Sequence, residues 1–317
     1  MERALALKPD LALLARKLLP AFSLLLVVAA IAWLNPRAIS YLGFNLMLNL
    51  AIPIILATLA QMFVMAGNDL DLSIGAFVGF VGCVAATWLN EAPLLGAAVL
   101  FGSILVYAGL GALIHWRNLP SIVVTLGMSF VWQGLAILVL PDPGGAAPEW
   151  LMAAMGFAPP FVPFPILAAI LIAAATHFGL MRTSYGAILR ASGGNAAAVA
   201  RAGWSLLRIR MTLFGLAGLF GVLSGLSLIG ITTSGDANIG AGYTLLSIAG
   251  VILGGGEFVG GRVSPTGAVM GALTLALAAS SLLTFLQVPP DWQIAANGAI
   301  LILVLAARVL IGRGKAA

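Results

Sequence analysis

Long runs of apolar residues alternate with short polar segments along almost the whole chain. Ten such runs lie near residues 20–35, 43–66, 71–89, 94–115, 121–140, 162–181, 209–231, 242–255, 265–286 and 292–311. A transmembrane helix needs about 20 consecutive, mostly apolar residues, and most of these runs approach or exceed that length. The pattern therefore predicts an all-α integral membrane protein with about ten transmembrane helices.

The composition supports this fold class. The chain has 317 residues, of which 62% are hydrophobic and 8% are charged, whereas a soluble domain carries about 25% charged residues. We therefore expect residues 1–317 to form a single transmembrane domain. The first run is expected to stay as a helix, because Glu2, Asp10 and two prolines precede it, unlike a typical signal peptide. The single cysteine, Cys83, excludes an intramolecular disulfide.

The basic residues indicate how the chain lies in the membrane. With the N-terminus in the cytoplasm and ten spans, all 15 lysines and arginines except Arg37 fall on the cytoplasmic side. Cytoplasmic loops of membrane proteins carry such a positive excess. We therefore expect both termini in the cytoplasm and residues 141–164 as a periplasmic loop, with helical turns at 149–155. The net charge of +5 is a topology signal and does not imply nucleic acid.

Residues 182–210 form the most basic stretch. They hold five arginines and no acid, and the charge pattern places them in the cytoplasm. Asn195 is a good N-cap, the following residues to Ala202 are mostly alanine, the best helix former, and Gly203 can close a helix in the left-handed conformation. A helix of about 8 residues is marginal alone in water. The stretch is either a tight surface connector or a short helix that fits a partner's groove.

Catalytic and metal-binding constellations are not evident in the sequence. His115 and His177 lie far apart, and no cluster of cysteines and histidines suggests a metal. Gly314-Lys315 is followed by Ala316, so the Ser or Thr of a phosphate-binding loop is missing. Few charged residues lie within the apolar runs, which argues against coupling to ions or protons.

Uncharged polar residues within the runs are few and partly paired. Three pairs share a helix face at a spacing of four residues: Asn45 with Asn49, Thr125 with Ser129, and Gln293 with Asn297. Gln61 also lies in the second run, outside these pairs. These residues either form hydrogen bonds between helices or line a path for a neutral, hydroxylated solute.

Two polar breaks and several glycines complete the pattern. Asp71 or Ser73 can cap the third helix, and we expect Asp71 and Arg262, which the topology places on the same side, to pair or to cap neighbouring helices. Small residues spaced four apart, such as Gly75 and Gly79 or Gly267 and Gly271, predict close helix packing. Residues 72–79 resemble 264–271, through either an internal repeat or shared glycine spacing.

Four segments resemble the membrane permeases of bacterial ABC importers of the ribose and simple-sugar type. They are Asn68 to Gly75 (NDLDLSIG), Leu119 to Gly127 (LPSIVVTLG), Thr183 to Gly203, and Ile248 to Gly267. Their order along the chain is that of the family. The asparagine and aspartate at 68 and 69, Ala196 and Trp204 depart from the family's usual residues, so a particular sugar is not implied.

The resemblance implies partners and residue roles. It implies that the chain pairs with a second permease chain, that two cytoplasmic ATPase subunits or one tandem ATPase dock beneath, and that a periplasmic solute-binding protein delivers the solute. ATP and Mg²⁺ would bind in the ATPase, with no cofactor in this chain. The implied coupling residues are Arg190, Gly194, Asn195, Ala198, Arg201 and Gly203, and the structural motif residues are Asp71, Ser73, Gly75, Gly255, Gly261, Arg262 and Gly267.

We therefore expect a multi-pass permease of the bacterial inner membrane that moves a monosaccharide or similar small polar solute. The alternatives are a secondary transporter or channel that works alone, and an integral membrane transferase. A transferase needs a reactive residue or paired acids near the bilayer surface, and the chain offers only turn carboxylates.

Overall fold

The computed structural model describes residues 11–278, Trp292 and Ala299. In this part of the chain every regular element is a helix, and the only β-type pairing is an isolated bridge between Gly144 and Gly235. The first half holds α1 (Leu11–Leu34), η2 (Pro36–Ala38), α2 (Tyr41–Leu48), α3 (Ala51–Ala66), α4 (Ile74–Ala86), α5 (Trp88–Glu91), α6 (Pro93–Arg117) and α7 (Ser121–Val139). The second half holds α8 (Glu149–Met155), α9 (Phe164–Ala174), the π-helical η3 (Ala175–Met181), α10 (Ser184–Gly194), α11 (Ala196–Arg201), α12 (Leu206–Thr232), α13 (Tyr243–Leu253) and α14 (Pro265–Ala276).

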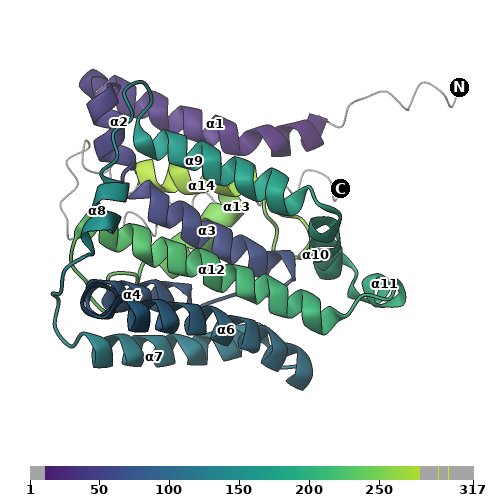
Figure 1. Cartoon of the computed structure of the whole chain (residues 1–317). Coiled ribbons are helices and arrows are strands. Elements are labelled where there is room, and N and C mark those ends of the chain that lie inside the picture. Colours follow the sequence, from purple (N-terminus) through teal and green to yellow (C-terminus); the bar gives the residue numbers. More distant parts are fainter. Residues whose placement is uncertain (1–10, 279–291, 293–298, 300–317) are drawn as a thin grey trace, which may run out of the picture.

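The long helix α12 forms the centre of the bundle and packs against α6, α3 and α4 (Figure 1). Glycines on α12 allow this contact, because a side chain at Gly218 would meet Tyr107 and one at Gly221 would meet Phe77. A side chain at Gly271 on α14 would likewise collide with the backbone of Gly250 on α13. The close packing expected at the small residues is therefore confirmed.

The helices agree with nine of the ten predicted spans. In the described part of the chain, five helical stretches are long and apolar enough to cross a membrane, and α2 with α3, which meet at a bend of 47°, make six if the pair is one span. The described part of α1 and helices α13 and α14 are apolar but shorter. The tenth predicted span, 292–311, lies outside the described residues, so the count of ten stays a prediction.

Two short helical regions mark opposite ends of the bundle (Figure 1). Helix α8, in the stretch predicted as the periplasmic loop, packs against the C-terminal end of α12, and Leu151 is buried there. Helices α10 and α11, in the basic stretch, lie at the other end. The predicted helical turns at 149–155 are thus confirmed, and the two segments lie on opposite sides as the charge pattern requires.

Candidate functional site

Helix α11 is closed at both ends by its own sequence. The Asn195 side chain accepts a hydrogen bond from the Ala198 N–H at 2.9 Å, as an N-cap does. At the other end Gly203 has φ +86°, its N–H bonds to the Ala200 carbonyl, and the Trp204 N–H bonds to the Val199 carbonyl. These two bonds form a Schellman motif, the common way of ending a helix at glycine. The predicted cap and stop are confirmed, on a helix of 6 residues.

Helix α11 stands away from the bundle (Figure 1). Of its six residues only Val199 is buried, while Ala198 and Arg201 are exposed. Arg201 donates to the Ala197 carbonyl of its own helix. Arg190 instead turns inward and donates to the Met181 carbonyl, which ties α10 to the end of η3. Of the two predicted coupling arginines, Arg201 is therefore the one whose side chain is exposed on the surface.

Three backbone segments meet where α10 ends. The Gly261 N–H donates to the Ala66 carbonyl at the end of α3, and a side chain at Gly193 would collide with this carbonyl and with Gly261 N. A side chain at the neighbouring Gly194 would meet nothing within 4 Å. This junction of Gly193, Ala66 and Gly261 joins the base of α11 to α3 and to the loop between α13 and α14. Gly255 and Gly261, expected in an irregular glycine-rich loop, both have positive φ.

The linker between α3 and α4, residues 67–73, is held by hydroxyl groups from other helices. Ser121 on α7 accepts from the Leu70 N–H at 3.1 Å, and Thr125, one turn later, accepts from the Leu72 N–H at 3.0 Å. Buried backbone N–H groups outside a helix require such partners. Thr125 is fully buried and, with Ser121 one turn earlier, bonds to the linker; its role in a solute path stays a prediction.

The start of α4 differs from the expected cap. The Ser73 side chain makes no capping bond, and the Gly75 N–H is instead satisfied by Thr244 Oγ1 of α13 at 3.0 Å. Asp71 accepts from the N–H and the hydroxyl of Ser73 and, at 3.0 Å, from the hydroxyl of Tyr107 on α6. Asp71 and Tyr107 are almost fully buried. Asp71 therefore joins the linker to α6 and does not cap a helix.

The expected pairing of Asp71 with Arg262 is wrong. Arg262 lies largely exposed and pairs with Glu257 at 3.1 Å. The buried ion pair of this region is Arg210 with Asp69, in which Nε and Nη2 contact the two carboxylate oxygens at 2.8 and 3.2 Å. Burial raises the pKa of Asp69, which lies in the linker outside the spans, and Arg210 opposes that shift. The sequence analysis missed this pair because 141 residues separate its members.

The remaining polar candidates have different surroundings. Asn45 accepts from the Phe164 N–H and so joins α2 to α9. Gln61 is buried. With its amide nitrogen and oxygen assigned so that both form hydrogen bonds, its side chain donates to the Asp71 carbonyl and accepts from the Asp71 N–H. Asn49, at the bend after α2, and Ser129 on α7 are half-buried. Gln293 and Asn297 lie outside the described residues. Among the described candidates, Asn49 and Ser129 remain open to a solute path.

The glycines of the two similar segments pack differently. A side chain at Gly75 or Gly79 would meet the loop before α13, at Gly240 and Ala237, whereas one at Gly267 would meet Gly254 after α13. The two segments therefore use opposite ends of α13. The structure gives no support beyond glycine spacing to an internal repeat.

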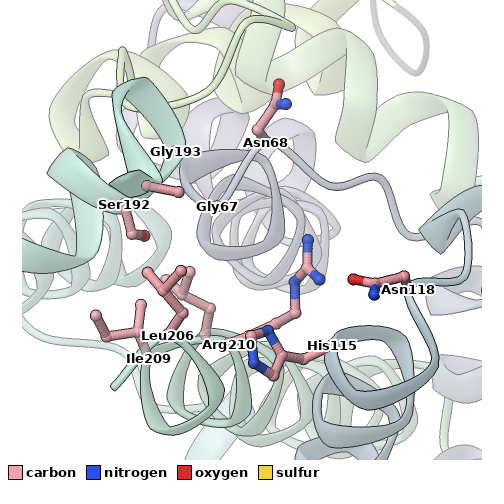
Figure 2. A pocket seen from close by; sticks show the side chains of 11 residues that line it. Gly67, Asn68, His115, Asn118, Ser192, Gly193, Leu206, Ile209 and Arg210 are labelled. Carbon is pink, nitrogen blue, oxygen red and sulfur yellow. The ribbon is translucent and has the colours of Figure 1, made fainter. Parts of the chain in front are cut away.

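A cavity of about 310 Å³ opens beside α11 (Figure 2). It lies between the linker, the C-terminal end of α6, helix α10 and the start of α12. Its walls are formed by Gly67, Asn68, His115, Asn118, Ser192, Gly193, Ala196, Leu206, Ile209, Arg210 and Leu213. Sequence analysis did not single it out, because its polar residues come from four separate segments. In the part of the chain that the structure describes, no group of three His, Cys, Asp or Glu residues is placed to hold a metal ion.

Comparisons with known proteins agree on one family. A family described as "Branched-chain amino acid transport system / permease component" matches residues 43–305. The probable ABC transporter permease protein YphD of Escherichia coli K12 is 30% identical over 90% of this chain and 89% of its own. The L-arabinose ABC transporter permease protein AraH of Azospirillum brasilense is 30% identical over 86% and 80%, respectively. The ribose import permease protein RbsC of E. coli K12 is 26% identical over 89% and 90%.

No solved structure matches the chain. The family match covers most of the sequence, the relatives are aligned over nearly their whole length, and the fold is a bundle of apolar helices. The chain therefore belongs to the family of ABC transporter permeases and is a multi-pass protein of the bacterial inner membrane.

Proposed function

We propose that this chain is the transmembrane subunit of an ATP-driven importer for a monosaccharide or a similar small polar solute. The observation that carries the proposal is α11, a short helix capped at both ends and held out from the bundle. Such a helix is too short to be stable by itself, and its exposed surface suits a groove on another protein. The family supplies that protein, because an ABC permease works with an ATPase.

In this proposal the α11 end faces the cytoplasm and the α8 end faces the periplasm. Two ATPase subunits dock on α11 and on its copy in a second permease chain, and a solute-binding protein docks at the α8 end. ATP and Mg²⁺ bind and react in the ATPase, and this chain supplies no cofactor site. Motion of α11 passes to α3 and to the loop before α14 through the junction of Gly193, Ala66 and Gly261.

A neutral hydroxylated solute fits the chain better than an amino acid, although the family description names branched-chain amino acids. An amino acid brings an ammonium and a carboxylate group, and burying either is costly without a partner. Apart from Arg210, which is paired with Asp69, the half-buried polar side chains on the described spans, such as Asn49, Ser129 and Gln133, carry no fixed charge. The names of two of these relatives specify arabinose and ribose. Uncharged donors and acceptors are sufficient for hydroxyl groups.

The test is ATP hydrolysis by the purified complex of this chain, its ATPase and its binding protein in lipid nanodiscs. The binding protein is loaded in turn with ribose, arabinose, xylose, leucine or valine. We expect one of the sugars to stimulate hydrolysis and the amino acids to have no effect. Stimulation by leucine or valine alone would contradict the proposed solute class, and the absence of any complex with the ATPase would contradict the proposed role.

A further inference from the structure

Several polar side chains in the walls of the cavity beside α11 have hydrogen-bonding groups with no partner within the described chain. Arg210 uses Nε and Nη2 for Asp69 and keeps Nη1. In the described part of the chain, the side chains of Asn68, His115 and Asn118 have no hydrogen-bond partner. Figure 2 shows Arg210, His115 and Asn118 close together at one side of the cavity. These groups are available to a ligand.

The chemistry of these walls matches a neutral ligand with several hydroxyl groups. The amides of Asn68 and Asn118 and the imidazole ring of His115 can each donate and accept, while Arg210 donates only. A hydroxyl group also does both, so a polyol or sugar can satisfy the whole set. An anion is less suitable, because Asp69 already balances the charge of Arg210. The volume of about 310 Å³ lies at the small end of the range for ligand pockets, about 300–1,000 Å³.

Because of the position of the cavity, a bound ligand would influence the transport cycle. Its walls include Ala196 at the start of α11, Gly193 at the junction, and residues of α6, α12 and the linker. A ligand that contacts all of these elements stabilises the arrangement in which the cavity exists, because binding shifts a population toward the state that binds better. Movement of α11 relative to α6 and α12 would break those contacts.

We propose that this cavity is an inhibitory site for the imported solute on the α11 side of the membrane. A neutral sugar that accumulates in the cytoplasm binds there and slows further transport. The identity of the solute and the side of the membrane rest on the proposed function, whereas the existence of the site rests on the cavity.

The first test is direct binding to the full-length chain, purified alone, by saturation-transfer-difference NMR. Ribose, arabinose and xylose are the probes, and inorganic phosphate is added as a competitor. We expect binding of a sugar that Asn118→Gly and His115→Ala weaken about tenfold, the effect of losing one or two hydrogen bonds. Asn118 has φ +50°, so glycine keeps the backbone. His177→Ala is the matched control, because His177 lies on η3 outside the cavity.

The second test is ATP hydrolysis by the complete complex in nanodiscs, where added sugar reaches both sides. We expect hydrolysis to rise and then to fall as the sugar concentration increases. In Asn118→Gly and His115→Ala the falling phase, relative to each variant's own maximum, shifts to about tenfold higher concentration, and in His177→Ala it stays in place.

The outcomes separate the two proposals. If sugar stimulates hydrolysis but neither binds the purified chain nor inhibits at high concentration, the inhibitory site is refuted and the importer stands. A falling phase that the cavity variants leave unchanged also refutes the site, as does competition by phosphate. If sugar binds at the cavity but no sugar stimulates hydrolysis, the sugar-importer function is refuted.

Discussion

Single polar side chains hold the linker between α3 and α4 in the interior of the bundle. Ser121 and Thr125 each satisfy one of its N–H groups, and Thr244 satisfies that of Gly75 at the start of α4. Tyr107 and Ser73 satisfy Asp71. A buried group without a partner costs about 1–3 kcal/mol, so these contacts decide whether the linker keeps its path.

Replacement of Tyr107 tests this network. Tyr107→Phe removes the hydroxyl that donates to Asp71 Oδ2 and leaves the ring in place. We expect a loss of about 1–3 kcal/mol in the free energy of unfolding, seen as a lower unfolding temperature in detergent. Tyr185→Phe is the control, because the Tyr185 hydroxyl bonds to Thr212 at the surface and its loss should change stability by less than about 0.5 kcal/mol. Equal shifts in the two variants would contradict the network.

The residue contacts show which kinds of interaction a sequence reveals. The Asn195 cap was predictable because donor and acceptor are three residues apart. The bond from Tyr107 to Asp71 spans 36 residues, and the pair of Arg210 and Asp69 spans 141. Such contacts depend on how whole helices pack, so spacing along the chain cannot reveal them. For the same reason the sequence does not reveal that Thr125 bonds to the linker.

Helix α11 depends on its caps because it is too short to be stabilised by its own hydrogen bonds. Asn195→Ala removes the cap, which costs about 0.5–2 kcal/mol of helix stability. We expect this variant to insert normally and to assemble with the ATPase, but to lose most of the stimulation of ATP hydrolysis by the loaded binding protein.

Asn195→Ser is the matched variant for α11, because serine is an equally good cap. We expect it to retain stimulation. If Asn195→Ala retains full stimulation as well, or if both variants lose it, the capped helix is not the element that couples the two subunits.

A second prediction concerns the junction at the end of α10. Gly193→Ala places a methyl group against the Ala66 carbonyl, whereas Gly194→Ala meets nothing within 4 Å. We expect Gly193→Ala to lower the unfolding temperature and reduce the stimulated hydrolysis. Gly194→Ala should match the wild-type chain in unfolding temperature. The account of the junction fails if the two adjacent substitutions behave alike.

The helices themselves were predictable to different degrees. Apolar runs located helices at nine of the ten predicted positions, five or six of them long enough to span a membrane, because a span requires only length and low polarity. The bend of 47° between α2 and α3 and the path of the linker before α4 were not predictable, and side chains of α7 hold the linker. The place of α11 was predictable only as a cytoplasmic segment, and the cavity beside it required the fold.

The whole molecule has two ends of different character, and the charge pattern assigns them to opposite sides of the membrane. Cys83 is the only cysteine of the chain and is fully buried, so a single added cysteine can report its own exposure. In spheroplasts we expect Ala154→Cys, on α8, to react with a membrane-impermeant thiol reagent. Ala200→Cys, on α11, should react only after permeabilisation. The reverse pattern, or reaction of both in intact spheroplasts, would contradict the assigned orientation.

Transport driven by an attached ATPase distinguishes this account from a transporter or channel that works alone. The direct measurement is uptake of a radiolabelled pentose, loaded on the binding protein, into proteoliposomes that contain this chain with or without the ATPase. We predict accumulation above the external concentration only with the ATPase and ATP present, and its loss in Asn195→Ala. Equal entry of the solute without the ATPase would contradict the central claim.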